Sequence, residues 1–246
     1  MHADRSAPTP LPVQNRRTTR RLPLAQAIEL AAKADLGSVS PLAGLIARGY
    51  RFGIARGLCL KLIRRLEGGD MYSATLRRIL KDFHGVEVGR YSYGPCLTPG
   101  ALPSGTRVGN YCSIASGLQV FRRNHPGNFL SQHPFFYNRT LGLLAGDAIV
   151  AETDNPLVIE HDVWIGSRVT ILPSCRRIGN GSILGAGSVV TRDIPAYTIW
   201  GGNPARFIRP RFEDDVRALV EKSLWWALPL QSLISAAGDL LNRPLA

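Results

Sequence analysis

The stretch DVWIGSRVTILPSCRRIGNGSILGAGSVVTRDIPAYTIWGGNPARFIR, residues 162–209, carries a repeat of six residues. Side chains alternate with a period of two in a strand and 3.6 in a helix, so neither element explains the repeat. A period of six instead predicts a solenoid with three flat faces per coil, each a short strand with one inward aliphatic side chain. The phased aliphatic residues are Ile159, Ile165, Ile171, Ile178, Leu184 and Val190.

Two local features of the repeat concern the corners of the coil. Gly166, Gly179 and Gly185 follow phased residues, which indicates that a corner needs a small side chain. Seven residues, rather than six, separate Ile171 from Ile178. The additional residue predicts a bulged corner at residues 174–177.

A second block of the repeat lies upstream, over residues 86–120, where Val108, Ile114 and Val120 are six apart. The two blocks, 86–120 and 157–208, suffice for between four and five coils of eighteen residues. The intervening segment, residues 121–156, breaks the period and is rich in polar, Pro and Gly residues. Long loops on a regular scaffold often carry function, so this segment is the candidate active-site loop.

Helices are expected on both sides of the solenoid, which extends over residues 85–210. We predict an N-terminal helical extension over 24–84, with helices at 24–35, 40–66 and 72–83, and a C-terminal helical cap over 211–246. The C-terminal cap is expected to begin with a helix that ends at Pro229, and a second short helix is expected to follow. A terminal helix is expected to cap an exposed end of the solenoid.

The segment 40–66 interleaves basic residues with Leu, Ile and Phe, which leaves two interpretations open. The helix packs on the domain with a solvated basic face, or it lies on a membrane surface. The basic residues are Arg48, Arg51, Arg56, Lys61, Arg64 and Arg65.

Composition restricts the class of protein. Of 246 residues, 45% are hydrophobic, and no apolar run reaches the ~18 residues of a membrane span. Residues 1–23 are rich in Pro and Arg and lack the apolar core of a signal peptide, so we expect a disordered basic tail and a cytoplasmic protein. The net charge of +12 favours anionic ligands, but no nucleic-acid motif accompanies it. The four cysteines lack metal spacing and are expected to be buried and reduced.

Residues 124–137, NHPGNFLSQHPFFY, resemble the active-site loop of the xenobiotic acetyltransferase branch of the hexapeptide-repeat acyltransferases. That branch includes chloramphenicol and streptogramin acetyltransferases and O-acetyltransferases of bacterial polysaccharides. The resemblance spans roughly residues 85–230 and includes VWIG, GAGSVVTRDIP, GGNPARFI and the tryptophans 225–226. It implies a mainly β fold, a left-handed parallel β-helix, assembled as a homotrimer with active sites between subunits.

The resemblance implies that His125 is the general base. A hydroxyl must lose its proton as it attacks a thioester carbonyl, and a neutral imidazole can accept it at pH 7. Direct transfer in a ternary complex is expected, because this chemistry needs no Ser or Cys nucleophile. His133 is expected to be structural or to line the acceptor site, and Asn124 to orient His125. Phe135, Phe136 and Tyr137 are candidates for the acceptor pocket, or they pack the loop onto a coil.

The resemblance also implies an acetyl-CoA site along the C-terminal coils. Small residues there allow the pantetheine arm to approach the backbone, and arginines suit its phosphates. Trp164 is expected either to wall the thioester site or to pack the subunit interface. The matching positions are Trp164, Ser167, Ala186, Thr191, Arg192 and Arg206.

These patterns predict an acetyl-CoA-dependent O-acetyltransferase without a metal, acting on a saccharide or glycan precursor. An antibiotic O-acetyltransferase is the alternative. A metalloenzyme similar to γ-carbonic anhydrases would need three His ligands. The available histidines, His84, His125, His133 and His161, include no closely spaced pair on the coils. An inactive scaffold is the remaining alternative.

Overall fold

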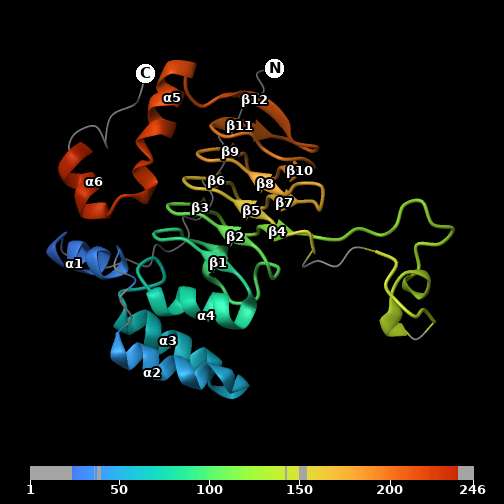
Figure 1. The fold of residues 1–246 in the computed structure, drawn as a ribbon, viewed down its shortest axis with the longest axis horizontal. Helices are drawn as coiled ribbons and strands as arrows, with labels where there is room; N and C mark the ends of the chain where they lie inside the picture. Colours follow the sequence, from blue (N-terminus) through green and yellow to red (C-terminus); the bar gives the residue numbers. More distant parts are fainter. Residues whose placement is uncertain (1–23, 36, 38–39, 142, 150–153, 238–246) are drawn as a thin grey trace, which may run out of the picture.

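The computed structural model describes residues 24–35, 37, 40–141, 143–149 and 154–237, so the predicted basic tail over 1–23 lies outside the described residues. A stack of parallel strands forms the centre, with helices at its N-terminal end and along one side (Figure 1). None of the described helices is long and apolar enough to cross a membrane.

The strands form three sheets, and from β2 to β10 consecutive strands of the chain fall on consecutive faces of the solenoid (Figure 1). All neighbours within the stack pair in parallel, and only the last strand, β12, runs antiparallel to β11. The first face holds β1 (Glu87–Val88), β2 (Arg107–Val108), β5 (Val158–Ile159) and β8 (Arg177–Ile178). The second holds β3 (Ser113–Ile114), β6 (Trp164–Ile165), β9 (Ile183–Leu184), β11 (Thr198–Gly201) and β12 (Arg206–Pro210). The third holds β4 (Gln119–Val120), β7 (Thr170–Ile171) and β10 (Val189–Val190).

The phased aliphatic residues form the interior of the solenoid, as the six-residue period predicts. In each two-residue strand the first side chain points outward and the second points inward. The six phased residues between 159 and 190 are at most 1% exposed, and Val120, where the loop begins, is only partly buried. Stacked aliphatic ladders of this kind are the main source of hydrophobic stabilisation in a solenoid.

The corners of the coil place a small side chain at one position and a residue with positive φ at another. The residue after the phased one must be small where the next coil passes close by, as at Gly109, Gly166 and Gly179. The third residue after the phased one adopts a positive φ, but it need not be glycine: Tyr111, Asp162 and Arg168 have φ of 55–61°. The prediction that small residues mark the corners therefore holds for the first position only.

Gly166 gives a direct test of this close approach. A Cβ there would lie 2.6 Å from the backbone nitrogen of Ala186 and 2.9 Å from the carbonyl oxygen of Leu184. We expect Gly166→Ala to destabilise the protein by about 1–3 kcal/mol, because the coils must separate. Urea unfolding measures the loss. Gly127→Ala is the matched control, since no atom lies within 4 Å of its added Cβ, and equal losses in both variants would contradict the packing argument.

The additional residue lies at the corner between β7 and β8, as predicted. Cys175 is fully buried there, and its N–H donates to the carbonyl of Leu172 at 3.0 Å. The register resumes at once, because Val158 pairs with Arg177 and Ile159 pairs with Ile178. All four cysteines are free and buried, as the sequence indicates.

The N-terminal helices are α1 (Leu24–Asp35), α2 (Pro41–Arg48), α3 (Arg56–Leu66) and α4 (Ala74–His84). The prediction of one helix over 40–66 is wrong, because two short 3₁₀ turns, Gly49–Arg51 and Gly53–Ala55, separate α2 from α3. The glycines of this region have low helix propensity, which favours the break. The helix expected at 72–83 is α4, which Ser73 caps by accepting the N–H of Leu76.

Helix α4 joins the helical end to the solenoid. Leu76 and Leu80 belong to the solenoid core, whereas Ile79 packs with Tyr50 and Ile63 into a second cluster. Helices α2 and α3 therefore attach to the solenoid mainly through α4, and they lie side by side at the bottom of the view (Figure 1).

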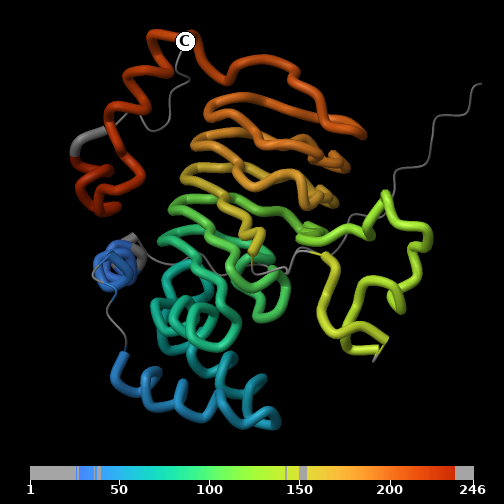
Figure 2. Tube along the Cα trace, turned by 45° about the vertical axis from the view of Figure 1, so that its right-hand side comes forward, coloured from blue at the N-terminus to red at the C-terminus, as the bar shows by residue number. Residues whose placement is uncertain are grey.

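The C-terminal segment runs along the side of the solenoid, which corrects the prediction that it caps an end. Helix α5 (Asp214–Ser223) stops at Leu224, whose φ of 47° is left-handed, and a 3₁₀ turn, Trp225–Ala227, leads to α6 (Leu230–Ala237). The expected single helix to Pro229 is therefore wrong. Figure 2 shows the chain descending from the last coil towards α1.

His161 fastens this segment to the coils. Its Nδ1 accepts the N–H of Asn110 at 2.9 Å, and its ring stacks on Trp226 at 5.6 Å. Burial lowers the pKa of His161 below the ordinary value of 6.5. The neutral ring therefore adds stability above about pH 6.5, and this stability is lost as the pH falls towards the lower folded-state pKa.

We expect the melting temperature to fall between about pH 7.5 and pH 5.5, and less steeply in His161→Asn, because this titrating group is removed. Calorimetry at both pH values measures the two slopes. Burial also lowers the pKa of His84. His84 therefore still makes the melting temperature depend on pH in the His161→Asn variant. An unchanged slope in His161→Asn would contradict this role of His161.

Candidate active site

The loop of residues 121–156 begins directly after β4, on the third face of the solenoid. The N–H of Phe121 still donates to the carbonyl of Ile171, after which the chain leaves the stack. Figures 1 and 2 both show the loop extending away from the body of the molecule. Its described residues include the short 3₁₀ helices Pro134–Phe136 and Arg139–Leu141.

A buried arginine holds the two ends of the loop together. Arg122 is 2% exposed, and its guanidinium donates to the carbonyl of Asn155 at 2.7 Å and to that of Cys175 at 2.8 Å. The Asn155 amide donates in turn to the carbonyls of Arg122 and Pro173, at 3.2 and 2.9 Å. These bonds leave no signature in the sequence, because Arg122 is one of 26 arginines and its partners are backbone atoms.

His125 is oriented by the backbone of its own loop. Its Nδ1 lies 2.8 Å from the carbonyl oxygen of Gln132. A carbonyl only accepts, so Nδ1 carries the proton and Nε2 retains its lone pair. The buried ring of Tyr137 packs edge-on against the imidazole at 5.2 Å, with its hydroxyl 3.2 Å from Nδ1 and 3.4 Å from Nε2. The side chain of His125 is exposed and can meet a substrate.

His133 has the opposite arrangement. Its Nδ1 accepts the N–H of Phe135 at 3.3 Å and so caps the 3₁₀ helix Pro134–Phe136, while its ring lies 4.3 Å from that of Phe135. A neutral ring with an accepting Nδ1 carries its proton on Nε2. Of the two loop histidines, only His125 therefore has its accepting lone pair at Nε2.

The other predicted loop residues take separate positions. Asn124 is exposed, and the carbonyl of Gln132, rather than Asn124, orients His125. Phe135 and Phe136 are 44% and 56% exposed, so they are free to contact a second molecule. Tyr137 is 7% exposed and packs against His125.

The residues predicted for the acetyl-CoA site lie on the solenoid around β10. Ser167 and Ala186 occupy the same corner in successive coils, where the N–H of Gly187 donates to the carbonyl of Ser167 at 2.8 Å. Thr191 and the exposed Arg192 lie at the other end of β10. Val189 exchanges hydrogen bonds with Gly202 and Ala205, which brings the start of β12, with Arg206, beside β10.

Trp164 projects outward from β6 on the neighbouring face and is 54% exposed. It pairs in register with Ser113 on one side and Ile183 on the other. The structure thus brings the residues predicted for the acetyl-CoA site onto one part of the solenoid. It leaves His125 on the outstretched loop, apart from them within the same chain (Figures 1 and 2).

Across the described part of the chain, no group of three or more His, Cys, Asp or Glu side chains could hold a metal ion. His161 is engaged with Asn110 and Trp226, and His84 accepts or donates a hydrogen bond with the Tyr50 hydroxyl at 2.8 Å. The described histidines thus lie in separate environments, two on the loop and two against packed structure.

Known proteins with similar sequences are acetyltransferases, although no protein-family model matches the chain. A chloramphenicol acetyltransferase of Escherichia coli is 33% identical over 178 residues, which cover 65% of this chain and 84% of that protein. A "Probable macrolide acetyltransferase" of Lysinibacillus sphaericus is 36% identical, over 55% of this chain and 82% of that protein. A solved hexapeptide-repeat acetyltransferase of Vibrio cholerae, complexed with acetyl coenzyme A, is 20% identical with a TM-score of 0.39, over 77% of this chain and 91% of that one.

The identity to the E. coli enzyme over most of its length establishes the class of protein. The chain belongs to the hexapeptide-repeat acetyltransferase family, in agreement with its six-residue repeat and its stack of parallel strands. It is accordingly an enzyme, an acetyl-CoA-dependent acyltransferase.

Proposed function

We propose that the protein transfers the acetyl group of acetyl-CoA to a hydroxyl of a saccharide or glycan precursor, with His125 as the general base. One observation carries the assignment of the base: the bond from Nδ1 to the carbonyl of Gln132 makes Nε2 the accepting nitrogen, with the Tyr137 hydroxyl as its neighbour at 3.4 Å. The base is exposed for an acceptor, while Tyr137 packs against its ring.

The reaction is a direct transfer. Nε2 of His125 takes the hydroxyl proton as the oxygen attacks the thioester carbonyl, and a tetrahedral intermediate forms. The intermediate then releases coenzyme A as a thiolate, which recovers the proton from the imidazolium. Backbone N–H groups stabilise the oxyanion. No acyl-enzyme is needed, and all four cysteines are buried away from solvent.

The donor lies along β10 in this proposal. Ser167 and Ala186 border the pantetheine arm at one corner, with Thr191 at the other, and Trp164 walls the thioester end. Arg192 and Arg206 are exposed and carry the charge that suits phosphates. Asn124, His133, Phe135 and Phe136 line the acceptor side of the loop, and Tyr137 contributes through its contact with His125.

The assembly is a homotrimer of left-handed β-helices, built from the segments 24–84, 85–210 and 211–246. The loop supports a site between subunits, because it extends away from its own solenoid (Figure 1). Its apolar side chains Leu130, Phe136 and Leu143 are 108%, 56% and 65% exposed in the single chain. A neighbouring subunit would cover them and bring its β10 to His125. We place the enzyme in the cytoplasm, where acetyl-CoA is available.

A second acceptor class is favoured by the names of the relatives. They are named as chloramphenicol and macrolide acetyltransferases, so an antibiotic hydroxyl is the alternative acceptor. The exposed rings of Phe135 and Phe136 suit the face of a sugar as well as a flat aromatic drug.

Free thiol release from acetyl-CoA, measured across sugars, nucleotide sugars, chloramphenicol and a streptogramin, tests the proposal. We expect release that depends on a saccharide acceptor, with the acetylated sugar identified by mass. Turnover of an antibiotic alone would replace the saccharide with the alternative acceptor. Absence of coenzyme A binding by calorimetry would contradict the donor site.

A further inference from the structure

The helical end of the molecule carries an exposed surface of mixed character, which the proposed acetyl transfer does not use. It comprises α2, α3 and the turns between them, and we call it the α2–α3 surface. Its exposed apolar side chains are Leu42, Leu45, Phe52, Ile54, Leu58, Leu62 and Leu66. These residues are 38–105% exposed, with Ile54 at the upper limit, although the same elements also bury Ala43, Tyr50 and Ile63 in a cluster with α4.

The charge of this surface has one sign. Residues 36–66 contain six basic residues and no acidic residue. Within the described part of the chain, Arg48, Lys61 and Arg65 form no ion pair. The neighbouring helix α4 differs, because Arg78 pairs with Asp82 and Lys81 pairs with Glu87. The excess positive charge is therefore concentrated on α2 and α3.

The apolar and basic side chains share one side of α3. Cys59 and Ile63 face the buried cluster, whereas Leu58, Leu62, Lys61 and Arg65 are all exposed. Beside them, Phe52 and Ile54 protrude from the turn that joins the two helices, and the guanidinium of Arg51 lies 4.8 Å from the ring centroid of Phe52. Apolar side chains that protrude among cations suit the boundary between lipid headgroups and acyl chains.

We propose that the α2–α3 surface binds an anionic lipid bilayer. Phe52, Ile54 and Leu58 enter the headgroup region, while Lys61 and Arg65 contact lipid phosphates. Both requirements of interfacial binding, apolar insertion and attraction to anionic lipid, are met by exposed residues of one short segment. A protein groove would need a contiguous apolar stripe, whereas here cations interrupt the apolar residues. The inference does not depend on the acceptor of acetyl transfer.

Cosedimentation of the full chain with vesicles tests the proposal, using phosphatidylcholine alone and phosphatidylcholine mixed with phosphatidylglycerol. We expect binding to the anionic vesicles only, weakened by salt, because charges near a surface are screened beyond about 10 Å at 0.1 M. The double variant Lys61→Glu/Arg65→Glu should lower the partition coefficient onto the anionic vesicles by about fivefold or more for each cation removed. Phe52→Ser/Ile54→Ser should lower it about tenfold or more.

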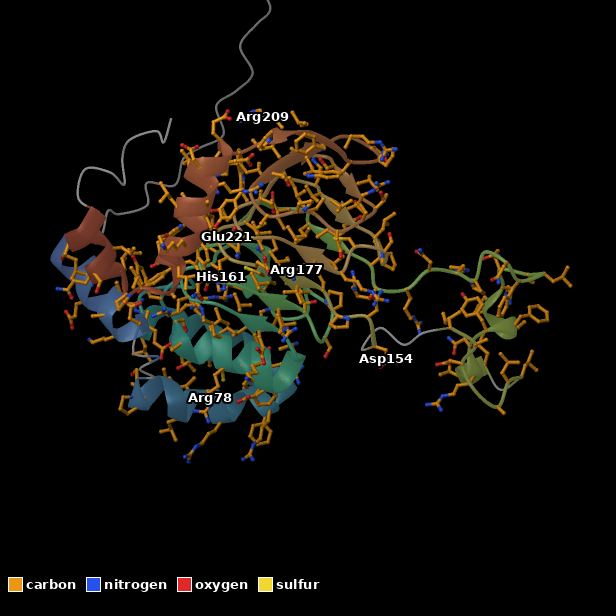
Figure 3. All side chains as sticks on the ribbon, turned by 45° about the horizontal axis from the view of Figure 1, so that its top comes forward. Arg78, Asp154, His161, Arg177, Arg209 and Glu221 are labelled. Atoms are coloured by element: carbon orange, nitrogen blue, oxygen red, sulfur yellow. The ribbon has the colours of Figure 1, made fainter. Side chains whose placement is uncertain are left out.

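Matched controls lie at the other end of the molecule. Leu219 on α5 is 69% exposed, and Arg209 on β12 lies at the end of the molecule opposite α2 and α3 (Figure 3). Leu219→Ser and Arg209→Glu should bind vesicles as the unaltered protein does. Because every changed residue is exposed, thermal melts should confirm that all variants fold.

Three results would overturn the proposal. The first is no binding to anionic vesicles. The second is equal loss of binding in the control variants. The third is self-association, detected by light scattering without lipid, that the Phe52→Ser/Ile54→Ser variant abolishes, which would assign the surface to a second copy of the chain.

Discussion

His125→Ala should lower kcat for acetyl transfer by about 10²–10⁴-fold, because the variant lacks the proposed general base. The KM for acetyl-CoA should change little, since the proposed donor contacts come from residues of the solenoid and not from His125. Steady-state kinetics with the responding acceptor measure both parameters. A loss confined to KM, with kcat unchanged, would contradict a role in proton transfer.

His133→Ala is the matched control, because it removes an exposed histidine eight positions further along the same loop. Its Nδ1 caps the 3₁₀ helix Pro134–Phe136 and its Nε2 carries a proton, so it cannot act as the base in this arrangement. We expect kcat to stay within about tenfold of the unaltered enzyme, well short of the loss in His125→Ala. A fall in kcat as large as that in His125→Ala would contradict the assignment of the base to His125 on the ground of its tautomer.

Arg122→Ala should destabilise the protein by about 3–5 kcal/mol, which is the cost typical of removing one partner from a buried hydrogen-bonded charged group. The substitution removes a nearly buried guanidinium and leaves the carbonyls of Asn155 and Cys175 without their donor. Because these bonds join both ends of the loop to the β7–β8 corner, kcat should fall as well, through misplacement of His125. Urea unfolding and steady-state kinetics measure the two effects.

Arg107→Ala provides the control for Arg122. Arg107 belongs to the same coil, in β2, but its side chain is exposed on the outer face. An exposed arginine of this kind contributes little, so the loss should stay below about 0.5 kcal/mol. Arg122→Lys should recover only part of the stability, because an ammonium cannot reach several carbonyls in the fork geometry of a guanidinium. Full recovery of the free energy of unfolding in Arg122→Lys would show that the positive charge, and not the fork geometry of the guanidinium, stabilises this contact.

The solenoid was predictable because its signal is local and repeated. Each phased residue, such as Ile165 or Ile178, fills the same interior position one face later, so the six-residue period maps directly onto the core. The extra residue before Ile178 was also placed correctly, since an insertion in such a period can only enlarge a corner. The breaks at Gly49 and Leu224 were not predicted, because helix ends depend on weak propensities and on tertiary contacts.

The sequence nominates candidate site residues, but it does not contain their geometry. The loop motif drew attention to both His125 and His133, whereas the difference between them comes from the carbonyl of Gln132 and the N–H of Phe135. Backbone partners leave no signature in a sequence. The same holds for Arg122, whose partners at Asn155 and Cys175 are 33 and 53 residues away.

The central claim is that the base of one subunit acts on the donor held by the solenoid of another. It rests on the loop that carries His125 away from its own β10 (Figures 1 and 2). Two variants separate the halves of the site: His125→Ala removes the base, and Ala186→Trp blocks the donor at an exposed corner. Each variant alone should be nearly inactive.

The most direct measurement is the acetyl transfer rate of the two variants after they are unfolded together, mixed in equal amounts and refolded. If sites form between subunits, about a quarter of them combine an intact loop with an intact solenoid, and about a quarter of the activity returns. If each site forms within one chain, no mixed assembly contains an intact site. Activity that stays at the level of the separate variants would contradict the account.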